Sequence, residues 1–501
     1  MRGLLGVFTL LSMLAATTAV FSAAAPASDA YVRAHRVVST HSAQAQAAFD
    51  DGLTLLYAFN PEQARRSFEN AASADPDLAM AWWGVAMSYG VNINTPFDSA
   101  QARHGHDAIA KARGLESDAS ASERALIAAA TQRFAYDRPS DAERSADAYR
   151  DAMEAAATTH LDDDDVQTLA AEAAMDVHPW SYFNADGSAT SGTPAIIARL
   201  QRVLARDPAH IGANHFLIHA LEESPHPQDA LAAATRLVAD SFEPAAEHLA
   251  HMPSHAFMRV GQYEAAGEAN ERALGLYRTY LAGDPAGHAD YFDHDCVFGV
   301  DAFMMSGDYE GARRIAGVCA RGSVGMLPIV ELRFRRWDAL ASNGADTDLT
   351  AAMLAAHDGR LDDAHKHLAN LQKVGSDTVG IQVDLVQARI ARAAGDREHE
   401  HEIASLLRAV ALQDRLGYSE PPAFWYPVRE TLGSAYVRAG RYADAEHTFR
   451  ADLVHDPNNP RSLFGLAQTL AQEGRTDEAR ETRARFTAAW KGATPPDLNE
   501  M

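Results

Sequence analysis

The sequence is short of basic residues and of several familiar catalytic signatures. Lys and Arg number 44 against 68 Asp and Glu, so the formal net charge is −24. A surface of that sign repels phosphate backbones, and we expect no nucleic-acid partner. The chain also has no phosphate-binding loop, dinucleotide fingerprint, G-x-S-x-G elbow or H-E-x-x-H helix. Their absence argues against the nucleotide-binding, serine-hydrolase and zinc-protease classes that depend on them.

Long apolar runs are missing after the N-terminus. The first residues hold one basic side chain, Arg2, followed by an apolar run from Leu4 to Phe21 and small residues from Ser22 to Ser28. This is the layout of a secretory signal peptide, which we place at residues 1–27, with an uncleaved anchor as the alternative. No cysteine lies near the junction, so a lipid-anchored form has no attachment point. Because no later segment approaches the length of a membrane span, we expect an exported, periplasmic protein with no membrane contact after signal removal.

Strand patterns are absent as well, and apolar residues recur at helical spacing. The clearest unit runs from Leu432 to Pro460, and another starts at Leu466. Gly440 and Gly474 are 34 residues apart, as are Leu432 and Leu466. This period, with small residues where helices touch and proline after the second helix, resembles tetratricopeptide repeats (TPRs) over residues 428–490.

The same corner pattern, G-x-[YL]-x-x-A, recurs upstream at Gly261, Gly307 and Gly359. Near the N-terminus, one more unit matches, with Gly52 and Phe68 in the expected roles. The spacing between units is uneven, which indicates insertions. We therefore predict an all-α, TPR-like α-solenoid of helical hairpins with irregular insertions.

This organisation predicts four segments after the signal peptide. Helical hairpins with insertions occupy residues 28–200, and His-rich central hairpins occupy residues 201–340. Further hairpins and a Pro-rich junction follow at residues 341–427, then two regular repeats and a tail at residues 428–501. Among the insertions, residues 176–187 carry Trp180, which would either cover the groove as a lid or serve as packing.

The central hairpins concentrate histidine. A first helix from Ile211 to Glu222 would place His215, His219 and Glu222 at i, i+4 and i+7, on one face. The stretch "EHLAHMPSHAF", residues 247–257, places three histidines at i, i+3 and i+7 in the next hairpin; they are His248, His251 and His255. Pro253 would kink this helix or begin its second half, so His251 and His255 form the firmer pair. The third first helix offers Asp290, His294 and Asp295.

First helices of successive solenoid hairpins stand side by side, about 8–10 Å apart, so facing imidazoles can meet at one ion. We predict a bound transition-metal ion, with zinc, copper, iron and manganese all compatible. The expected ligands are His215, His219, His251, His255 and His294, with His248 and Asp290 as further candidates. A polar, pH-sensitive groove without metal is the alternative.

Two functions fit this pattern. A metal-dependent enzyme would need an open coordination position and a general base, for which Glu222 and Glu223 are the candidates, and would act on a small molecule or peptide in the groove. A solvated helix end is the simpler interpretation of Glu223. A non-catalytic scaffold would bind a peptide or partner protein instead, for which Arg438, Arg441 and Arg475 of the C-terminal repeats are suited.

The chain has only two cysteines, Cys296 and Cys319. They lie at similar distances before and after the Gly307 corner, so antiparallel helices would bring them into bonding range. An exported compartment permits a disulfide, while two unpaired buried thiols remain the alternative.

The central segment, residues 207–311, resembles a group of bacterial TPR proteins. The resemblance rests on the blocks "NHFLIHALEESPHP" and "HLAHMPSH", which include Asn214, Ser224 and Pro225 beside the histidines. It implies the fold and a shared His-rich centre, but no activity or substrate. That group carries His-Asn in its third helix, whereas this chain has His294-Asp295, where the aspartate is also able to coordinate.

Overall fold

The computed structural model describes residues 31–285, 287, 291–320, 325–396 and 398–501. The predicted signal peptide and Asp290 lie outside the described residues. Within these ranges the chain is helical, and the only β pairings are two isolated bridges, Asn92 with Thr95 and Phe183 with Ala189. The predicted all-α class is confirmed. None of the described helices combines the length and apolar character needed to cross a membrane.

The helices follow one another as antiparallel pairs. The N-terminal part contains α1 (Ala43–Tyr57), α2 (Pro61–Ala74), α3 (Ala79–Met87), α4 (Ser99–Gly114), α5 (Ala121–Arg133), α6 (Ala142–Thr159), α7 (Asp164–Met175) and α8 (Thr193–Arg206). The central part contains α9 (Ile211–Leu221), α10 (Leu231–Ala239), α11 (Glu247–His251), α12 (Pro253–Arg259), α13 (Tyr263–Gly283), α14 (Phe292–Ser306) and α15 (Tyr309–Cys319).

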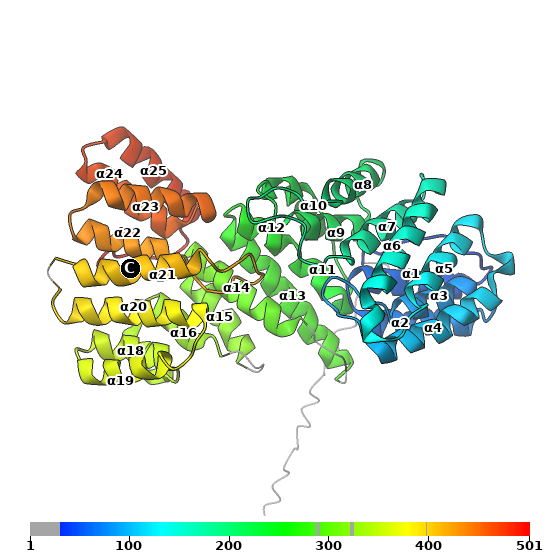
Figure 1. The fold of residues 1–501 in the computed structure, drawn as a ribbon, viewed down its shortest axis with the longest axis horizontal. Helices are drawn as coiled ribbons and strands as arrows, with labels where there is room; N and C mark the ends of the chain where they lie inside the picture. The colour runs from blue at the N-terminus through cyan, green and yellow to red at the C-terminus, as the bar shows by residue number, and fades with distance from the viewer. Residues whose placement is uncertain (1–30, 286, 288–290, 321–324, 397) are drawn as a thin grey trace, which may run out of the picture.

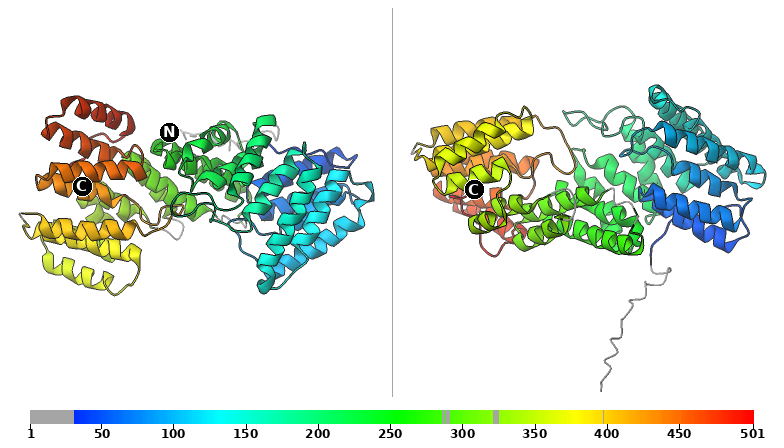
Figure 2. Two further views of the ribbon diagram at one scale, coloured as in Figure 1. Left: turned by 45° about the horizontal axis from the view of Figure 1, so that its top comes forward. Right: turned by 90° about the horizontal axis from the view of Figure 1, so that it is seen from below.

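The C-terminal part contains α16 (Leu327–Arg333), α17 (Trp337–Asn343), α18 (Asp348–His357), α19 (Leu361–Leu371), α20 (Asp377–Ala393), α21 (Glu400–Gln413), α22 (Val428–Arg438), α23 (Tyr442–His455), α24 (Pro460–Gln472) and α25 (Thr476–Ala489). Figure 1 shows these pairs side by side in an elongated array, with α1–α7 at one end, α18–α25 at the other and α9–α14 between them. The turned views of Figure 2 show the same order. Each hairpin therefore packs mainly against its neighbours, as in a solenoid.

Two distant hairpins pack in the same way, with a phenylalanine ring seated between two glycines. At Gly52 and Gly84 a β-carbon would come within 2.7 and 2.3 Å of the Phe68 ring, which fills the space between α1, α2 and α3. In the same way, Gly433 and Gly465 leave no room for a β-carbon beside Phe449, at 2.5 and 2.1 Å. In both places the spacing is Gly-x15-Phe-x15-Gly. The N-terminal hairpin is thus built on the same plan as the regular C-terminal repeats.

The predicted corner glycines also adopt the expected conformation. Five of them have positive φ: Gly261 (75°), Gly307 (83°), Gly359 (74°), Gly440 (71°) and Gly474 (79°). This left-handed conformation ends the first helix of a hairpin at little cost when the residue is glycine. Phe59 and Arg335 serve the same purpose elsewhere, with φ of 54° and 55°, so those corners carry no glycine signal.

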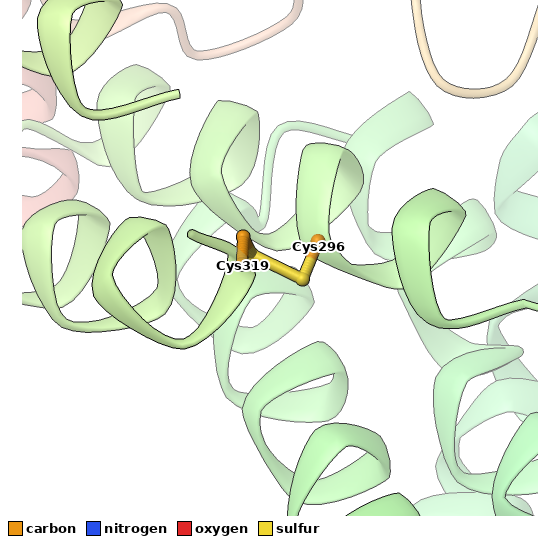
Figure 3. The surroundings of a disulfide bond; sticks show 2 residues. All are labelled: Cys296 and Cys319. Atoms are coloured by element: carbon orange, nitrogen blue, oxygen red, sulfur yellow. A yellow bond between two sulfur atoms is a disulfide. The ribbon is translucent and has the colours of Figure 1, made fainter. Parts of the chain in front are cut away.

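Cys296 of α14 and Cys319 of α15 form a disulfide with a Cα–Cα distance of 5.7 Å (Figure 3). The bond crosses the hairpin whose corner is Gly307, at the place expected from the sequence. Both cysteines are buried, in a cluster with Val300 and Ile315. The bond therefore fixes α14, which carries His294, against its partner helix.

Removing this disulfide should weaken the fold. We expect Cys296→Ala/Cys319→Ala to lower the free energy of unfolding by about 3 kcal/mol, because the crosslink closes a loop with a sequence separation of 23 residues. Urea unfolding of both proteins, with and without reductant, measures this. Reductant should shift the wild type alone. Equal midpoints under non-reducing conditions would contradict the prediction.

Candidate metal centre

Helix α9 supplies the first two histidines. His210 caps its N-terminus by accepting a hydrogen bond from the Ala213 amide through Nδ1, at 3.2 Å. All residues from Ile211 to Leu221 are buried, so α9 lies inside the array rather than on an open groove. His215 and His219 are one helical turn apart, and their ring centroids are 4.9 Å from each other.

Residues 247–257 do not form one continuous helix; the helix is interrupted at Pro253, where a kink or a new helix start was expected. Helix α11 ends at His251, and α12 begins at Pro253 and carries His255. The break leaves His251 and His255 in contact, with centroids 4.7 Å apart. His294 comes from the first turn of α14 and lies 4.8 Å from His251. Six imidazoles from α9, α11, α12 and α14 thus form one continuous cluster.

The cluster divides into two triads, and not into the single centre predicted. The first triad is His215, His219 and His248; the second is His251, His255 and His294. In each triad the three candidate ligand atoms lie within 4.8 Å of one another. The triads touch, with 5.5 Å between the His219 and His255 rings and 5.6 Å between the His248 and His251 rings.

In the first triad, one ring nitrogen of each α9 imidazole has a polar partner, and the other has no hydrogen-bond partner among the described residues. His215 Nδ1 donates to the Tyr57 carbonyl oxygen at 2.6 Å, and His219 Nδ1 lies 3.2 Å from Glu222 Oε1. Their Nε2 atoms are buried and have no hydrogen-bond partner among the described residues, and neither ring nitrogen of His248 has one. Buried polar atoms without partners are costly, so this pattern points to a ligand.

In the second triad, three Nε2 atoms converge. The His251 Nε2 atom lies 2.7 Å from that of His255 and 3.1 Å from that of His294. Separations of this order are close to those of nitrogen ligands around one ion, since each Zn–N bond is about 2.0–2.1 Å long.

The opposite side of these rings decides where their protons are. Asn270 Nδ2 donates to the Ala266 carbonyl oxygen at 2.8 Å, so Asn270 Oδ1 is the atom that faces His251 Nδ1, at 2.6 Å. His255 Nδ1 faces Glu222 Oε2 at 2.8 Å. His251 Nδ1 therefore donates to Asn270, which leaves the His251 Nε2 lone pair pointing at His255 Nε2, 2.7 Å away. A histidine that donates to an oxygen on its far side is oriented to bind a metal ion through its other nitrogen.

Burial keeps most of these rings neutral. It lowers the pKa of His215, His248 and His251 well below 6.5, aided by the neighbouring imidazoles. Burial also lowers the pKa of His219, and that of His294 to about 3. His255 differs, because Glu222 outweighs its burial and raises its pKa. Neutral imidazoles are the form that binds metal ions.

Glu222, predicted as a general base, lies beneath both triads. One of its oxygens faces His219 and the other His255, and the residue is 1% exposed. Burial alone would raise the pKa of Glu222, but His219 and His255 outweigh it and lower that pKa to about 2. This geometry suits a carboxylate that orients imidazoles. The other candidate, Glu223, is half-buried, and burial with the nearby Glu222 charge raises its pKa.

A cavity of about 520 Å3 reaches the cluster from outside. His219, His248, His255 and His294 form part of its wall. The rest comes from distant segments: residues 92–96, Pro179 with Trp180, Tyr291, and Glu420. Trp180 contacts the His219 ring at 5.6 Å and donates from Nε1 to the Ile93 carbonyl oxygen at 2.9 Å. The insertion around Trp180 therefore packs against the histidine cluster and borders the cavity.

Glu420 is a functional candidate that the sequence reasoning missed. It belongs to the Pro-rich junction, accepts a hydrogen bond from the Tyr418 hydroxyl, and its Oε2 is buried without a partner among the described residues. Burial raises the pKa of Glu420 to about 7, against the opposing effect of His255. A carboxyl group of this pKa beside the histidine cluster is suited to proton transfer. The one available signal was an acidic residue in a junction otherwise rich in proline and aromatics.

Comparison with known proteins supports the repeats and says nothing of the cluster. Residues 430–493 match the tetratricopeptide-repeat family model, which confirms the predicted repeats there. No curated protein sequence matches the chain. Solved structures similar to it include yeast Tom70, at 10% identity over 89% of this chain and 92% of that one, with a TM-score of 0.28. Human IFIT1, crystallised as a dimer with m7Gppp-AAAA, is 11% identical over 88% and 90%, with a TM-score of 0.33. Scores this low do not extend any property of these proteins to this chain.

Proposed function

We propose that this helical-repeat protein binds transition-metal ions through the two histidine triads of its central hairpins. The observation that carries the proposal is the convergence of the His251, His255 and His294 Nε2 atoms, at 2.7 and 3.1 Å. On the far side, His251 Nδ1 donates to Asn270 Oδ1, and His255 Nδ1 lies 2.8 Å from Glu222 Oε2. The unpartnered Nε2 atoms of His215 and His219 support a second ion in the first triad.

The ligand set favours a catalytic rather than a purely structural ion. Three protein ligands leave one coordination position open, as in catalytic zinc sites, whereas structural sites use four. His294 and His255 line the cavity, so the open position of the second triad would face it. Imidazole-only ligands suit zinc, copper and iron. When bound, such an ion would polarise a substrate oxygen or activate a water molecule, with Glu420 placed to accept or return a proton.

The cavity of about 520 Å3 is large enough for a small molecule or for a side chain of a peptide. Asn92 and Asn94 offer amide groups on the cavity wall, and Tyr291 and Trp180 offer aromatic faces. We therefore propose metal-assisted hydrolysis or hydration of a small polar substrate as the activity class. The non-catalytic scaffold remains the second candidate, favoured by the TPR match over residues 430–493.

Metal analysis tests the proposal. Purified protein, stripped with chelator and reconstituted with Zn²⁺, should retain about one ion per triad after desalting. His251→Ala/His294→Ala should lose the ion of the second triad, and His215→Ala/His248→Ala that of the first. Mass spectrometry of the metal, with titration calorimetry, measures both.

The matched control is His226→Ala. His226 is exposed and follows the same helix α9 by a few residues. It should keep the wild-type metal content. If wild type and both double variants retain equal amounts of metal, the triads are not the binding site, and the scaffold function is favoured.

Export to the periplasm completes the proposal. The N-terminal sequence pattern supports it, and so does the Cys296–Cys319 disulfide, since such bonds persist in oxidising compartments. Detection of mature chains that begin near residue 28 would test it.

A further inference from the structure

Both histidine triads open onto a single cavity of about 520 Å3. Each triad contributes two rings to the cavity wall. The four rings on the wall are His219, His248, His255 and His294. The third ring of each triad, His215 or His251, is fully buried and does not line the cavity. An ion in either triad would therefore have its open coordination position toward the same space.

The two triads are also in direct contact. The His219 and His255 rings are 5.5 Å apart, and the His248 and His251 rings are 5.6 Å apart. Glu222 joins the triads from below, because one of its oxygens lies 3.2 Å from His219 Nδ1 and the other 2.8 Å from His255 Nδ1. Two-metal catalytic sites hold their ions about 3.5–4 Å apart, which requires that the two ligand sets touch, as they do here.

The carboxylates near the triads lie on the side away from the cavity. Glu222 faces two Nδ1 atoms, and Asp295 Oδ1 lies 3.1 Å from His251 Nδ1; neither carboxylate lines the cavity. Among the described residues of the cavity wall, Glu420 is the one acidic side chain. The other polar side chains there, besides the histidines, carry amide or hydroxyl groups: Asn92, Asn94, Thr95 and Tyr291. The positive charge of two bound ions would therefore act mainly on whatever enters the cavity.

We propose that the two triads form one dinuclear metal centre, and that its substrate is a small molecule with a phosphate or carboxylate group whose oxygens bridge the two ions. This inference rests on the proposed metal function and narrows it in two respects. Both ions act on the same molecule, and that molecule is an anion. An oxyanion is the natural ligand for this space, because it offers one oxygen to each ion and neutralises charge that the cavity wall leaves uncompensated.

Electron paramagnetic resonance of the copper-loaded protein tests the pairing directly. Two Cu²⁺ ions a few ångströms apart couple magnetically, whereas isolated ions do not. Wild type loaded with two Cu²⁺ ions per chain should show a coupled spectrum, with less signal per copper than isolated ions give. The two variants that keep one triad each should bind one ion and give the isolated spectrum; they are His251→Ala/His294→Ala and His215→Ala/His248→Ala. The matched control His226→Ala should give the coupled spectrum of the wild type.

Dilution with zinc provides the same comparison without any substitution, in case a double variant fails to fold, which circular dichroism would show. Wild type that receives a trace of Cu²⁺, with Zn²⁺ filling the remaining sites, should give the isolated spectrum. Because Zn²⁺ is diamagnetic, each copper ion then has a silent neighbour in an otherwise unchanged protein.

Titration calorimetry of the zinc-loaded protein tests the bridging ligand. The probes are inorganic phosphate, acetate and neutral acetamide. Phosphate or acetate should bind to wild type at least about tenfold more tightly than to either double variant, because the second metal contact becomes intramolecular. The anion that gains more identifies the group that the substrate carries. Acetamide should show no such gain.

The outcomes separate this inference from the metal function on which it rests. Two bound copper ions with the spectrum of isolated ions, or equal affinity of wild type and both double variants for phosphate and acetate, would overturn the dinuclear centre and leave metal binding intact. Absence of metal from both triads would overturn the metal function and this inference with it.

Discussion

Replacing Glu222 by alanine should lower the free energy of unfolding by about 3–5 kcal/mol, because it strands two buried imidazoles that the carboxylate now pairs. Glu222 faces Nδ1 of His219 at 3.2 Å and Nδ1 of His255 at 2.8 Å. One residue thus orients a ligand in each triad. We expect the affinity for metal to fall about 10–100-fold at both triads, as for other second-shell partners of metal-bound histidine.

Urea unfolding of the metal-free protein and calorimetric Zn²⁺ titration measure the two effects. Glu223→Ala is the matched control, since Glu223 is the adjacent residue and is only half-buried. It should change stability by less than about 1 kcal/mol and leave metal affinity unaltered. Equal behaviour of the two variants would show that the carboxylate beneath the triads does not hold the imidazoles.

Acidification should release metal from the second triad before the first. The pKa of all three rings of the first triad is lowered below 6.5, so protons compete with the metal only below that pH. In the second triad, Glu222 raises the pKa of His255, so protonation of that ring begins to compete near neutral pH. Each pH unit below the pKa of one ligand costs about tenfold in affinity. As the pH falls from about 7.5 to 5.5, the second triad should therefore lose its metal ion before the first.

The two double variants separate the triads in this experiment. His251→Ala/His294→Ala leaves the first triad alone, and His215→Ala/His248→Ala leaves the second. Apparent Zn²⁺ affinity measured against pH in a non-chelating buffer should stay level over most of this range for the former and fall for the latter. Parallel curves would mean that the Glu222 carboxylate does not set the proton affinity of His255.

Much of the fold was predictable because it depends on local patterns. Corner glycines with positive φ, such as Gly307 and Gly440, are readable from the sequence since few other residues tolerate that conformation. Corners formed by Phe59 and Arg335 carry no such signal. Proline chemistry left two outcomes at Pro253, a kink or the start of a second helix, and the structure has the second; the pairing of His251 with His255 agrees with the helical period.

The candidate centre was only partly predictable, because its details depend on contacts between elements. Spacing identified the six histidines, but their division into two triads depends on side-chain positions that periodicity does not encode. Asn270, which contacts His251, lies on α13, a helix that carries none of the six histidines. Glu420 lies more than a hundred residues after His294 in the sequence. The arginines predicted to bind a partner protein show the same limit, because each of them is paired with a carboxylate of this chain. Arg438 pairs with Glu402, Arg441 with Asp444, and Arg475 with Glu478.

The corner at Gly261 has a consequence for the way the molecule is built. A β-carbon there would lie 1.8 Å from the Pro457 carbonyl oxygen, which also accepts a hydrogen bond from the Tyr263 hydroxyl at 2.9 Å. The loop between α23 and α24 is therefore wedged against the hairpin that bears His255. Repeat units of a simple array can be deleted or exchanged one at a time, since each touches only its neighbours. Here, changes to the α23–α24 loop would also disturb the Gly261 corner, which closely follows the helix that bears His255.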